Sequence, residues 1–193
     1  MSTAVAPVRP GQVLADLLPA SRVRDIALVV GGAALTGLAA QLSVPVPGSP
    51  VPVTGQTFAV LLVGMTLGAG RGFLSLALYA VAGVAGVPWF ADGGSGAAAA
   101  SFGYILGMIL ASTVVGALAR RGADRSVWMT AGAMLLGEAI IYAVGVPYLA
   151  YSADLSLATA VDVGLTNYLI GDALKAAVVM GLLPTAWKLV NKG

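Results

Sequence analysis

Long apolar stretches, each interrupted by only a few polar residues, follow one another along most of this chain. A helix needs about 20 predominantly apolar residues to cross the hydrocarbon core of a bilayer. Six stretches approach that length, at residues 26 to 42, 54 to 69, 72 to 87, 101 to 119, 127 to 146 and 163 to 184. The pattern predicts an all-α integral membrane protein with six transmembrane helices.

The connection between the second and third stretches consists only of Gly70 and Arg71, so we expect these two helices to form a tight hairpin. Both are short for a full span, which favours tilting, local thinning of the bilayer or extension into the flanking loops. The last span is expected to end at Pro184. The first 25 residues lack the apolar core and small-residue cleavage site of a signal peptide. We therefore divide the chain into a tail, residues 1 to 21, and a transmembrane domain, residues 22 to 193.

The composition also indicates a membrane environment. Of the 193 residues, 59% are hydrophobic and only 9% are charged, whereas soluble proteins average about 25% charged residues. A soluble fold of this length would lack the polar residues to cover its surface, which excludes a soluble enzyme. The chain contains no Cys and no His. Disulfides, thiolate nucleophiles, the usual zinc ligands and imidazole chemistry are thereby excluded, and we expect no metal, cofactor or catalytic residue.

Nine of the ten basic residues fall on one side of the predicted membrane. They lie before the first span, in the second and fourth connections, or after the last span: Arg9, Arg22, Arg24, Arg71, Arg120, Arg121, Arg125, Lys188 and Lys192. The opposite connections, residues 43 to 53, 88 to 100 and 147 to 162, contain no basic residue. Because cytoplasmic loops collect Lys and Arg, both termini are expected in the cytoplasm.

Three ionisable residues lie inside the predicted spans: Glu138, Asp172 and Lys175. Each costs at least about 2.5 kcal/mol near the bilayer centre and therefore normally faces a cavity or a partner. The rise of a helix places all three roughly 12 to 18 Å from the outer ends of their spans. Asp172 and Lys175 are three apart on one helix face, so they either staple helices together or share a polar ligand. Glu138 either contacts the ligand or serves as a partner for Lys175 or for a hydroxyl such as that of Ser112 or Thr113.

A proline-rich loop joins the first two spans on the outer side. Residues 44 to 53 read VPVPGSPVPV, and the prolines remove backbone donors and favour an extended conformation. Such a stiff hairpin can rest against protein at membrane depth, either as a lid over a site or as a rigid connector. Gln56 follows directly and offers both donors and an acceptor at the head of the second span.

The connection between the third and fourth spans carries aromatic residues on both sides of a flexible GGSG turn. Trp89 and Phe90 precede this turn and Tyr104 follows it, while Tyr142 adds an aromatic ring in the outer half of the fifth span. Aromatic residues at this level commonly form an interfacial belt. The same arrangement also fits a gate that closes over a flat ring system.

The chain lacks its own P-loop, because none of its three lysines lies in the pattern G-x-x-x-x-G-K-[ST]. No inverted pair of broken helices is evident, which argues against a self-sufficient ion-coupled transporter. If the chain takes part in active transport, a protein partner is therefore expected.

The sequence resembles the BioY family, the S components of energy-coupling factor (ECF) biotin transporters. The resemblance covers nearly the whole chain from about residue 22. It rests on residues 45 to 93, which begin PVPGSPVPVTGQTF, and on SFGYILG at 101 to 107, IIYAVGVPYLA at 140 to 150 and GDALKAA at 171 to 177. It implies high-affinity capture of biotin by a six-helix substrate-binding domain, residues 22 to 193, in a bacterial cytoplasmic membrane. It further implies that a transmembrane coupling protein and two cytoplasmic ATPase subunits complete the transporter.

The resemblance also assigns roles to particular residues. It implies that Asp172 and Lys175 contribute to the polar biotin site, and that the proline hairpin and the loop around Trp89 and Phe90 cover the ligand. Where some relatives have Arg, this chain has Tyr104, so Lys175 becomes the main cation for a polar end of biotin. Gln56 and Tyr104 are expected to satisfy the remaining polar groups, with Tyr142 and Glu138 as further candidates.

Three alternatives stay open at this point. The chain could be an S component for another vitamin, such as thiamine or riboflavin, with the same fold. It could be a solitary biotin facilitator that works without an energy-coupling module. It could also be an intramembrane enzyme in which Asp172 or Glu138 acts as a general acid or base, although only one carboxylate–lysine pair would then supply the chemistry.

Overall fold

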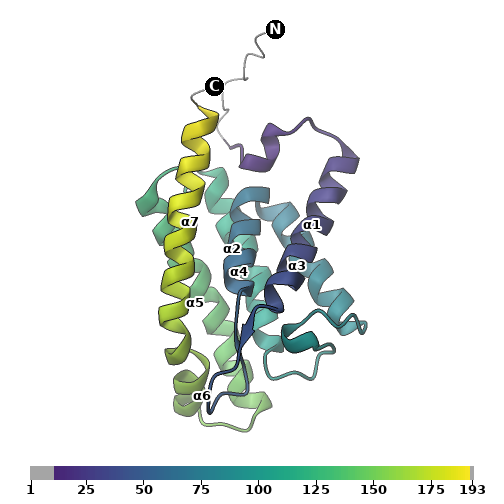
Figure 1. Ribbon diagram of the computed structural model, residues 1–193, viewed down its shortest axis with the longest axis vertical. Coiled ribbons are helices and arrows are strands. Elements are labelled where there is room, and N and C mark those ends of the chain that lie inside the picture. The colour runs from purple at the N-terminus through teal and green to yellow at the C-terminus, as the bar shows by residue number, and fades with distance from the viewer. Residues whose placement is uncertain (1–10, 192–193) are drawn as a thin grey trace.

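The computed structural model describes residues 11–191, and within this range the chain is mostly helical, as predicted (Figure 1). The α-helices are α1 (Arg22–Ala40), α2 (Gln56–Leu67), α3 (Ala69–Val84), α4 (Phe102–Arg120), α5 (Val127–Ser152), α6 (Leu157–Gly164) and α7 (Leu169–Val190). Three short 3-10 segments are η1 (Leu14–Leu17), η2 (Ala91–Gly93) and η3 (Thr166–Tyr168). Strands β1 (Ser43–Val44) and β2 (Val53–Thr54) pair antiparallel, with Ser43 opposite Thr54.

The helices follow the predicted spans, but not all of them have the length of a span. Among the described residues, four helical segments are long and apolar enough to cross a membrane, namely α1, α4, α5 and the stretch Leu157–Val190. The two helices of the predicted hairpin, α2 and α3, have only 12 and 16 residues. They are joined at Gly68, whose φ of +82° favours glycine. The hairpin is as tight as the sequence predicts, but the predicted connection, Gly70 and Arg71, lies in the first turn of α3, so the turn comes earlier in the chain.

The sixth predicted span, residues 163 to 184, is not one continuous helix. The chain leaves α6 at Gly164, passes through η3 and starts α7 at Leu169. The expected end at Pro184 is wrong, since α7 continues to Val190, and α5 likewise runs through Pro147. Proline removes one backbone hydrogen bond, and packed neighbouring helices allow an apolar helix to continue across it.

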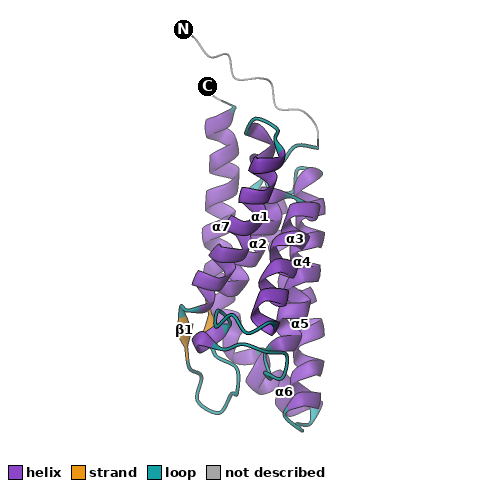
Figure 2. Ribbon diagram, turned by 90° about the vertical axis from the view of Figure 1, so that its right-hand side faces the viewer, coloured by secondary structure: helices purple, strands orange, loops and turns teal. Residues whose placement is uncertain are grey.

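The helices form an elongated bundle with the start of α1 and the end of α7 at the same end (Figures 1 and 2). The α2–α3 turn and the α4–α5 loop lie at this end too. All the described basic residues except Lys175 therefore lie at this end, as the charge pattern predicts. Apolar side chains cover much of the outside: Leu135 on α5 is 70% exposed and Ile170 on α7 is 79% exposed. Such a surface is stable in lipid rather than in water, which supports a membrane protein.

Helix α4 lies at the centre, in contact with α2, α3 and α5. Glycines allow this close approach. A Cβ atom at Gly107 would lie 2.8 Å from the carbonyl oxygen of Ile141 on α5, and one at Gly116 would lie 2.5 Å from the backbone nitrogen of Ala69 on α3. The backbones of three helices therefore touch α4 directly, which fixes the positions of the side chains that α2, α4 and α5 direct inward.

Residues 11–21, which the division at residue 22 assigns to the tail, pack across the basic end of the bundle; residues 1–10 of that tail lie outside the described range. Val13 is fully buried. The Asp16 carboxylate accepts hydrogen bonds from Arg71 at 2.8 Å and from Arg120 at 3.3 Å. This segment thus joins the α2–α3 turn to the end of α4.

Replacing Asp16 with Asn is expected to lower the free energy of unfolding by about 1–2 kcal/mol at pH 7, because two charged hydrogen bonds are weakened. Burial raises the pKa of the Asp16 carboxyl, but Arg71, the Val13 amide and Arg120 outweigh burial and hold this pKa below 3.8. The carboxyl therefore contributes stability above about pH 4, and that stability is lost as the pH falls through the lowered pKa. Thermal unfolding in detergent at pH 7 and pH 3 measures the effect.

The matched control is Asp154→Asn, which changes an exposed carboxylate at the opposite end of the bundle. Equal unfolding temperatures for the Asp16 variant and the unmodified protein at pH 7 would contradict the role of this ion pair.

Candidate functional site

The ionisable residues Asp172 and Lys175 form an ion pair on α7, as their spacing predicts. The Lys175 ammonium donates to Asp172 Oδ1 at 3.0 Å and to the Thr57 hydroxyl of α2, also at 3.0 Å. Thr57 in turn donates to the same carboxylate oxygen at 3.1 Å. The second oxygen, Oδ2, accepts a hydrogen bond from the Tyr142 hydroxyl of α5. Three helices therefore meet at one carboxylate, which is only 5% exposed.

The positions at which α2 and α7 start explain why these side chains converge. The chain turns at η3, so α7 starts only three residues before Asp172, and the ion pair lies near the start of that helix. The β1–β2 hairpin ends at Thr54 and α2 starts two residues later, which brings Thr57 to the same level. A helix places positions i and i+3 on one face, so both α7 side chains reach toward α2.

A second polar group lies beside this pair. Gln56 is 5% exposed; its amide donates to the Tyr79 hydroxyl at 3.0 Å, and its carbonyl oxygen accepts from Thr54 at 3.0 Å. Tyr104 donates from its hydroxyl to the Gly164 carbonyl at 2.8 Å and stacks edge-on against Tyr142 with ring centroids 6.2 Å apart. Both residues are thus held in place by bonds to other helices.

These residues line a small polar cavity of about 40 Å³, and we call it the polar cavity. Its walls include Gln56, Thr57, Tyr104, Tyr142, Asp172, Lys175 and Tyr168. Val51 and Pro52 of the hairpin loop close it. The loop is tied to η3, because the Tyr168 hydroxyl bonds to Ser49 at 2.9 Å and donates to the Val51 carbonyl. The proline-rich segment thus covers the cavity in this structure.

Trp89 and Phe90 do not line the polar cavity but pack behind it. The rings of both lie 5.2 Å from the Tyr79 ring, centroid to centroid. The Trp89 indole donates to the Tyr79 carbonyl at 3.0 Å, and the Tyr79 hydroxyl donates to the Trp89 carbonyl at 3.2 Å. These two aromatic residues therefore position Tyr79, which in turn holds Gln56; direct contact of either with a ligand stays a prediction.

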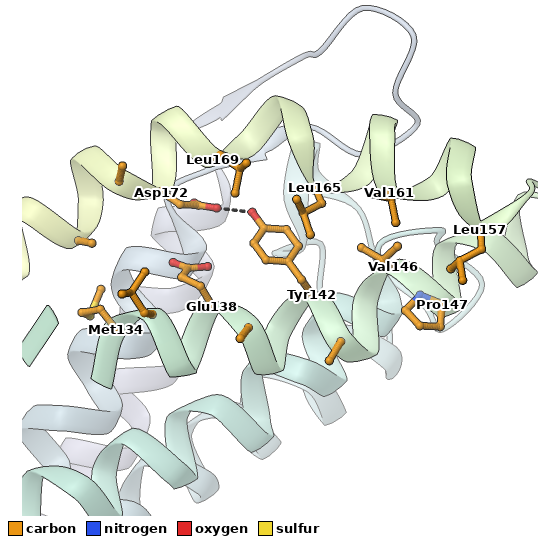
Figure 3. Close-up of a pocket in the computed structure, with 15 residues that line it drawn as sticks. Met134, Glu138, Tyr142, Val146, Pro147, Leu157, Val161, Leu165, Leu169 and Asp172 are labelled. Carbon is orange, nitrogen blue, oxygen red and sulfur yellow. Dashed lines mark hydrogen bonds between the residues drawn. The ribbon is translucent and has the colours of Figure 1, made fainter. Parts of the chain in front are cut away.

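Glu138 lies on α5 one turn from Tyr142, and Figure 3 shows its carboxylate directed toward α7. Both of its oxygens are buried and without a hydrogen-bond partner among the described residues. Of the two alternatives for Glu138, the pairing with Lys175 or with a hydroxyl is not formed. Lys175 bonds to Asp172 and Thr57, Thr113 donates to its own helix at the Ile109 carbonyl, and the Ser112 hydroxyl has no described partner. The sequence could not decide this, because the rotation of each helix about its axis is set by packing.

Sequence reasoning missed Tyr79 and gave no specific role to Thr57 or Tyr168. Thr57, which contacts both charged groups, is visible in the sequence only as a hydroxyl at the head of the second span, and Tyr168 only as one of several tyrosines. Tyr79 and Tyr168 are buried tyrosines, and a buried tyrosine hydroxyl normally needs a partner. That requirement was the available signal, but it does not tell which partner the hydroxyl finds.

The polar cavity combines several kinds of recognition in one place. Lys175 offers an ammonium group, Asp172 and Gln56 offer acceptors, Gln56 and the tyrosines offer donors, and the tyrosine rings offer flat apolar walls. Such a set suits a small organic molecule with both polar and apolar parts.

A bundle of apolar helices around a charged cavity, closed by a loop at one end, defines a class of membrane protein that holds a polar ligand at membrane depth. A sequence model of the BioY family matches residues 11–192. The chain belongs to the BioY family.

Similar proteins include the probable biotin transporter BioY of Pyrococcus horikoshii, 34% identical over 159 residues that cover 82% of this chain and 93% of that protein. The biotin transporter BioY of Thermotoga maritima is 34% identical over 148 residues, which cover 75% of this chain and 85% of that protein. The biotin transporter BioY2 of Lactococcus lactis is 30% identical over 162 residues, or 82% and 87% of the two chains.

The fold is also known from a solved structure. The crystal structure of the S-component for biotin from an ECF-type ABC transporter superposes with a TM-score of 0.78 over 88% of this chain and 95% of that chain. The two sequences are 20% identical, so this likeness establishes the fold and not the ligand.

Proposed function

We propose that this chain is the S component of an ECF-type biotin transporter and that it binds biotin in the polar cavity. The observation that carries the proposal is the Asp172–Lys175 pair, in which Asp172 is buried and Lys175 partly buried. The pair lies under the proline hairpin and is bonded to Thr57 and Tyr142 from two other helices. Membership of the BioY family and the similarity to named biotin transporters support biotin as the ligand.

Biotin matches the side chains around the cavity. Its ureido ring carries two N–H donors and a carbonyl acceptor, its thioether ring is apolar, and its aliphatic arm ends in a carboxylate. Lys175 is the described cation that lines the cavity, so it addresses a polar end of the ligand while Asp172 holds the ammonium in place. Gln56 and Tyr104 address the remaining polar groups.

Binding requires the hairpin loop to move. A volume of about 40 Å³ holds little more than one water molecule, far less than biotin needs. The loop between β1 and β2, residues 45–52, carries all four hairpin prolines and bonds to η3 through Tyr168. We expect it to swing as a stiff unit, admit the ligand and close again.

The proposal includes an orientation and a set of partners. The basic end of the bundle faces the cytoplasm of a bacterial cell and the hairpin faces outward, because Lys and Arg collect on cytoplasmic sides. Six membrane segments then cross or enter the bilayer, with α6 and α7 forming the last. A transmembrane coupling protein and two cytoplasmic ATPase subunits would supply the energy for transport, and this chain would act as a binding subunit rather than an enzyme.

Isothermal titration of the purified protein in detergent tests the proposal. Biotin, thiamine and riboflavin are titrated separately, and thermal unfolding confirms that the protein is folded. We expect saturable one-to-one binding of biotin alone. Binding of thiamine or riboflavin instead would assign another vitamin, and no binding by folded protein would overturn the assignment of the cavity to biotin.

Replacing Tyr168 with Phe is expected to weaken biotin binding about 5- to 10-fold, mainly through faster dissociation, because the hydroxyl that ties down the closed loop is removed. The ring and its packing are retained. Dissociation rates of labelled biotin from the two proteins measure the effect. Tyr151→Phe is the matched control, since Tyr151 is 88% exposed; equal dissociation rates for Tyr168→Phe and the control would contradict a closing role for this bond.

A further inference from the structure

A second hollow lies on the other side of the Tyr142–Asp172 bond. It is a groove of about 590 Å³ between α5 on one side and α6 and α7 on the other (Figure 3), and we call it the lateral groove. Leu135 and Leu169 on its rim are 70% and 51% exposed, so the groove opens on the outer surface of the bundle. Its floor includes the small residues Ala139 and Ala173.

The lateral groove is apolar except for three side chains: Glu138, Tyr142 and Asp172. Tyr142 and Asp172 also line the polar cavity. The single hydrogen bond between them therefore forms the partition between the two hollows. If the Tyr142 ring turns away, the polar cavity and the lateral groove become one space.

Glu138 makes this groove suited to a ligand that carries a positive charge or hydrogen-bond donors. The residue is 9% exposed, and neither carboxylate oxygen has a partner among the described residues. A buried carboxylate without a partner is costly at membrane depth, so this position is suited to a ligand that brings a cation or hydrogen-bond donors. Glu138 precedes Tyr142 by four residues on α5, and Lys175 follows Asp172 by three on α7. At the rise of a helix they lie about 6 Å and about 4.5 Å, respectively, from the partition toward the basic end of the bundle.

We propose that the lateral groove is a second ligand subsite that receives the amine-bearing end of a biotin amide. In such a molecule the carboxyl group of biotin is joined through an amide to an alkyl chain that ends in an ammonium group, as in the amide of biotin with 1,4-diaminobutane. The inference rests on the proposed binding of biotin in the polar cavity. The ring system occupies that cavity, the arm passes between Tyr142 and Asp172, and the ammonium pairs with Glu138.

Charge and shape distinguish this occupant from others. Free biotin ends in a carboxylate, which Glu138 and Asp172 repel, so biotin itself keeps its carboxylate on the Lys175 side of the partition. A lipid acyl chain would fill the apolar walls but would leave both Glu138 oxygens without a partner. An amide removes the negative charge of the arm, and its methylene groups suit the alanine-lined floor.

The experiment compares three probes on the full-length protein in detergent: biotin, the amide of biotin with 1,4-diaminobutane, and the amide of biotin with butylamine. The two amides have arms of similar length and differ in the terminal ammonium. Isothermal titration gives the dissociation constant of each. We expect the ammonium amide to bind at least 10-fold more tightly than the butyl amide.

Three variants test the residues. Glu138→Gln is expected to bring the ratio of the two amide dissociation constants close to one, whereas Glu138→Asp keeps the charge and retains part of the preference. Ala173→Phe fills the floor of the groove and is expected to weaken both amides at least 10-fold relative to biotin. Thermal unfolding checks that each variant is folded, and the ratio within one variant is insensitive to a loss of folded protein.

The outcomes separate the two proposals. If biotin binds and neither amide does, or if the preference for the ammonium survives in Glu138→Gln, the lateral subsite is overturned and biotin capture stands. If Ala173→Phe affects biotin and both amides equally, the groove does not hold the arm. If none of the three probes binds to the folded protein, the assignment to biotin fails, and the subsite fails with it.

Discussion

Replacing Asp172 with Asn is expected to weaken biotin binding at least 100-fold. The carboxylate holds Lys175 at 3.0 Å and accepts from both Thr57 and Tyr142. Asparagine keeps the shape but removes the charge, and breaking one partner of a buried ion pair typically costs about 3–5 kcal/mol. The remaining lysine then either loses its proton or turns toward another acceptor. Titration of the variant with biotin measures the loss, which is expected even if Asp172 itself never touches the ligand.

The matched control is Asp162→Asn, which removes a carboxylate from an exposed position on α6 at the same end of the bundle. It separates the local effect of the ion pair from a general change in charge. A second comparison, Lys175→Met, removes the cation while retaining the length of the side chain, and it should show a loss of similar size. Unchanged biotin affinity in the folded Asp172→Asn variant would contradict the assignment of this pair to the binding site.

The helices were predictable because membrane insertion imposes long apolar stretches on a sequence. The break between α6 and α7 was not. Its residues, LTNY, contain no proline and no glycine, and their conformation depends on Tyr168, whose hydroxyl bonds to a loop more than 100 positions earlier in the chain. A turn that is fixed by a distant partner leaves no local signal in the sequence.

The site was predictable to the extent that it follows from spacing along one helix. Asp172 and Lys175 share a face because they are three residues apart, and burial of two opposite charges makes their pairing a reasonable expectation. The contributions of Thr57 and Tyr142 depend on how α2 and α5 are rotated against α7. The sequence holds no direct record of that rotation. For the same reason the sequence leaves open whether Glu138 contacts a ligand or pairs with another side chain.

The glycines decide much of that rotation, since they determine where two backbones can touch. At Gly103 and Gly145 a side chain would overlap the rings of Tyr148 and Tyr104, respectively. At Gly116 it would overlap backbone. Gly103 and Gly145 thus make room for aromatic rings. Gly116 sets the distance between α4 and the α2–α3 turn, and the position of Thr57 on α2 relative to Asp172 depends on that distance.

Replacing Gly116 with Ala is therefore expected to lower the free energy of unfolding by about 2–3 kcal/mol, as overpacking of a tight core does. The new methyl group would lie 2.5 Å from the Ala69 nitrogen, 2.6 Å from the Gly68 carbonyl carbon and 2.8 Å from the Gly64 carbonyl oxygen. These are backbone atoms, so no side-chain rotation relieves the overlap, and the α2–α3 turn must move away from α4. Thermal unfolding of the purified protein in detergent measures the loss.

Gly132→Ala is the matched control. Gly132 lies inside α5, and no described heavy atom comes within 4 Å of a Cβ atom built there, so the substitution should leave stability unchanged or raise it, because alanine favours the helix. Movement of the turn should also shift α2 and with it Thr57, so biotin binding to the fraction of Gly116→Ala that remains folded should weaken as well. Equal unfolding temperatures for Gly116→Ala and Gly132→Ala would show that α4 and the α2–α3 turn can separate without loss of stability. That result would contradict a tight backbone contact at Gly116.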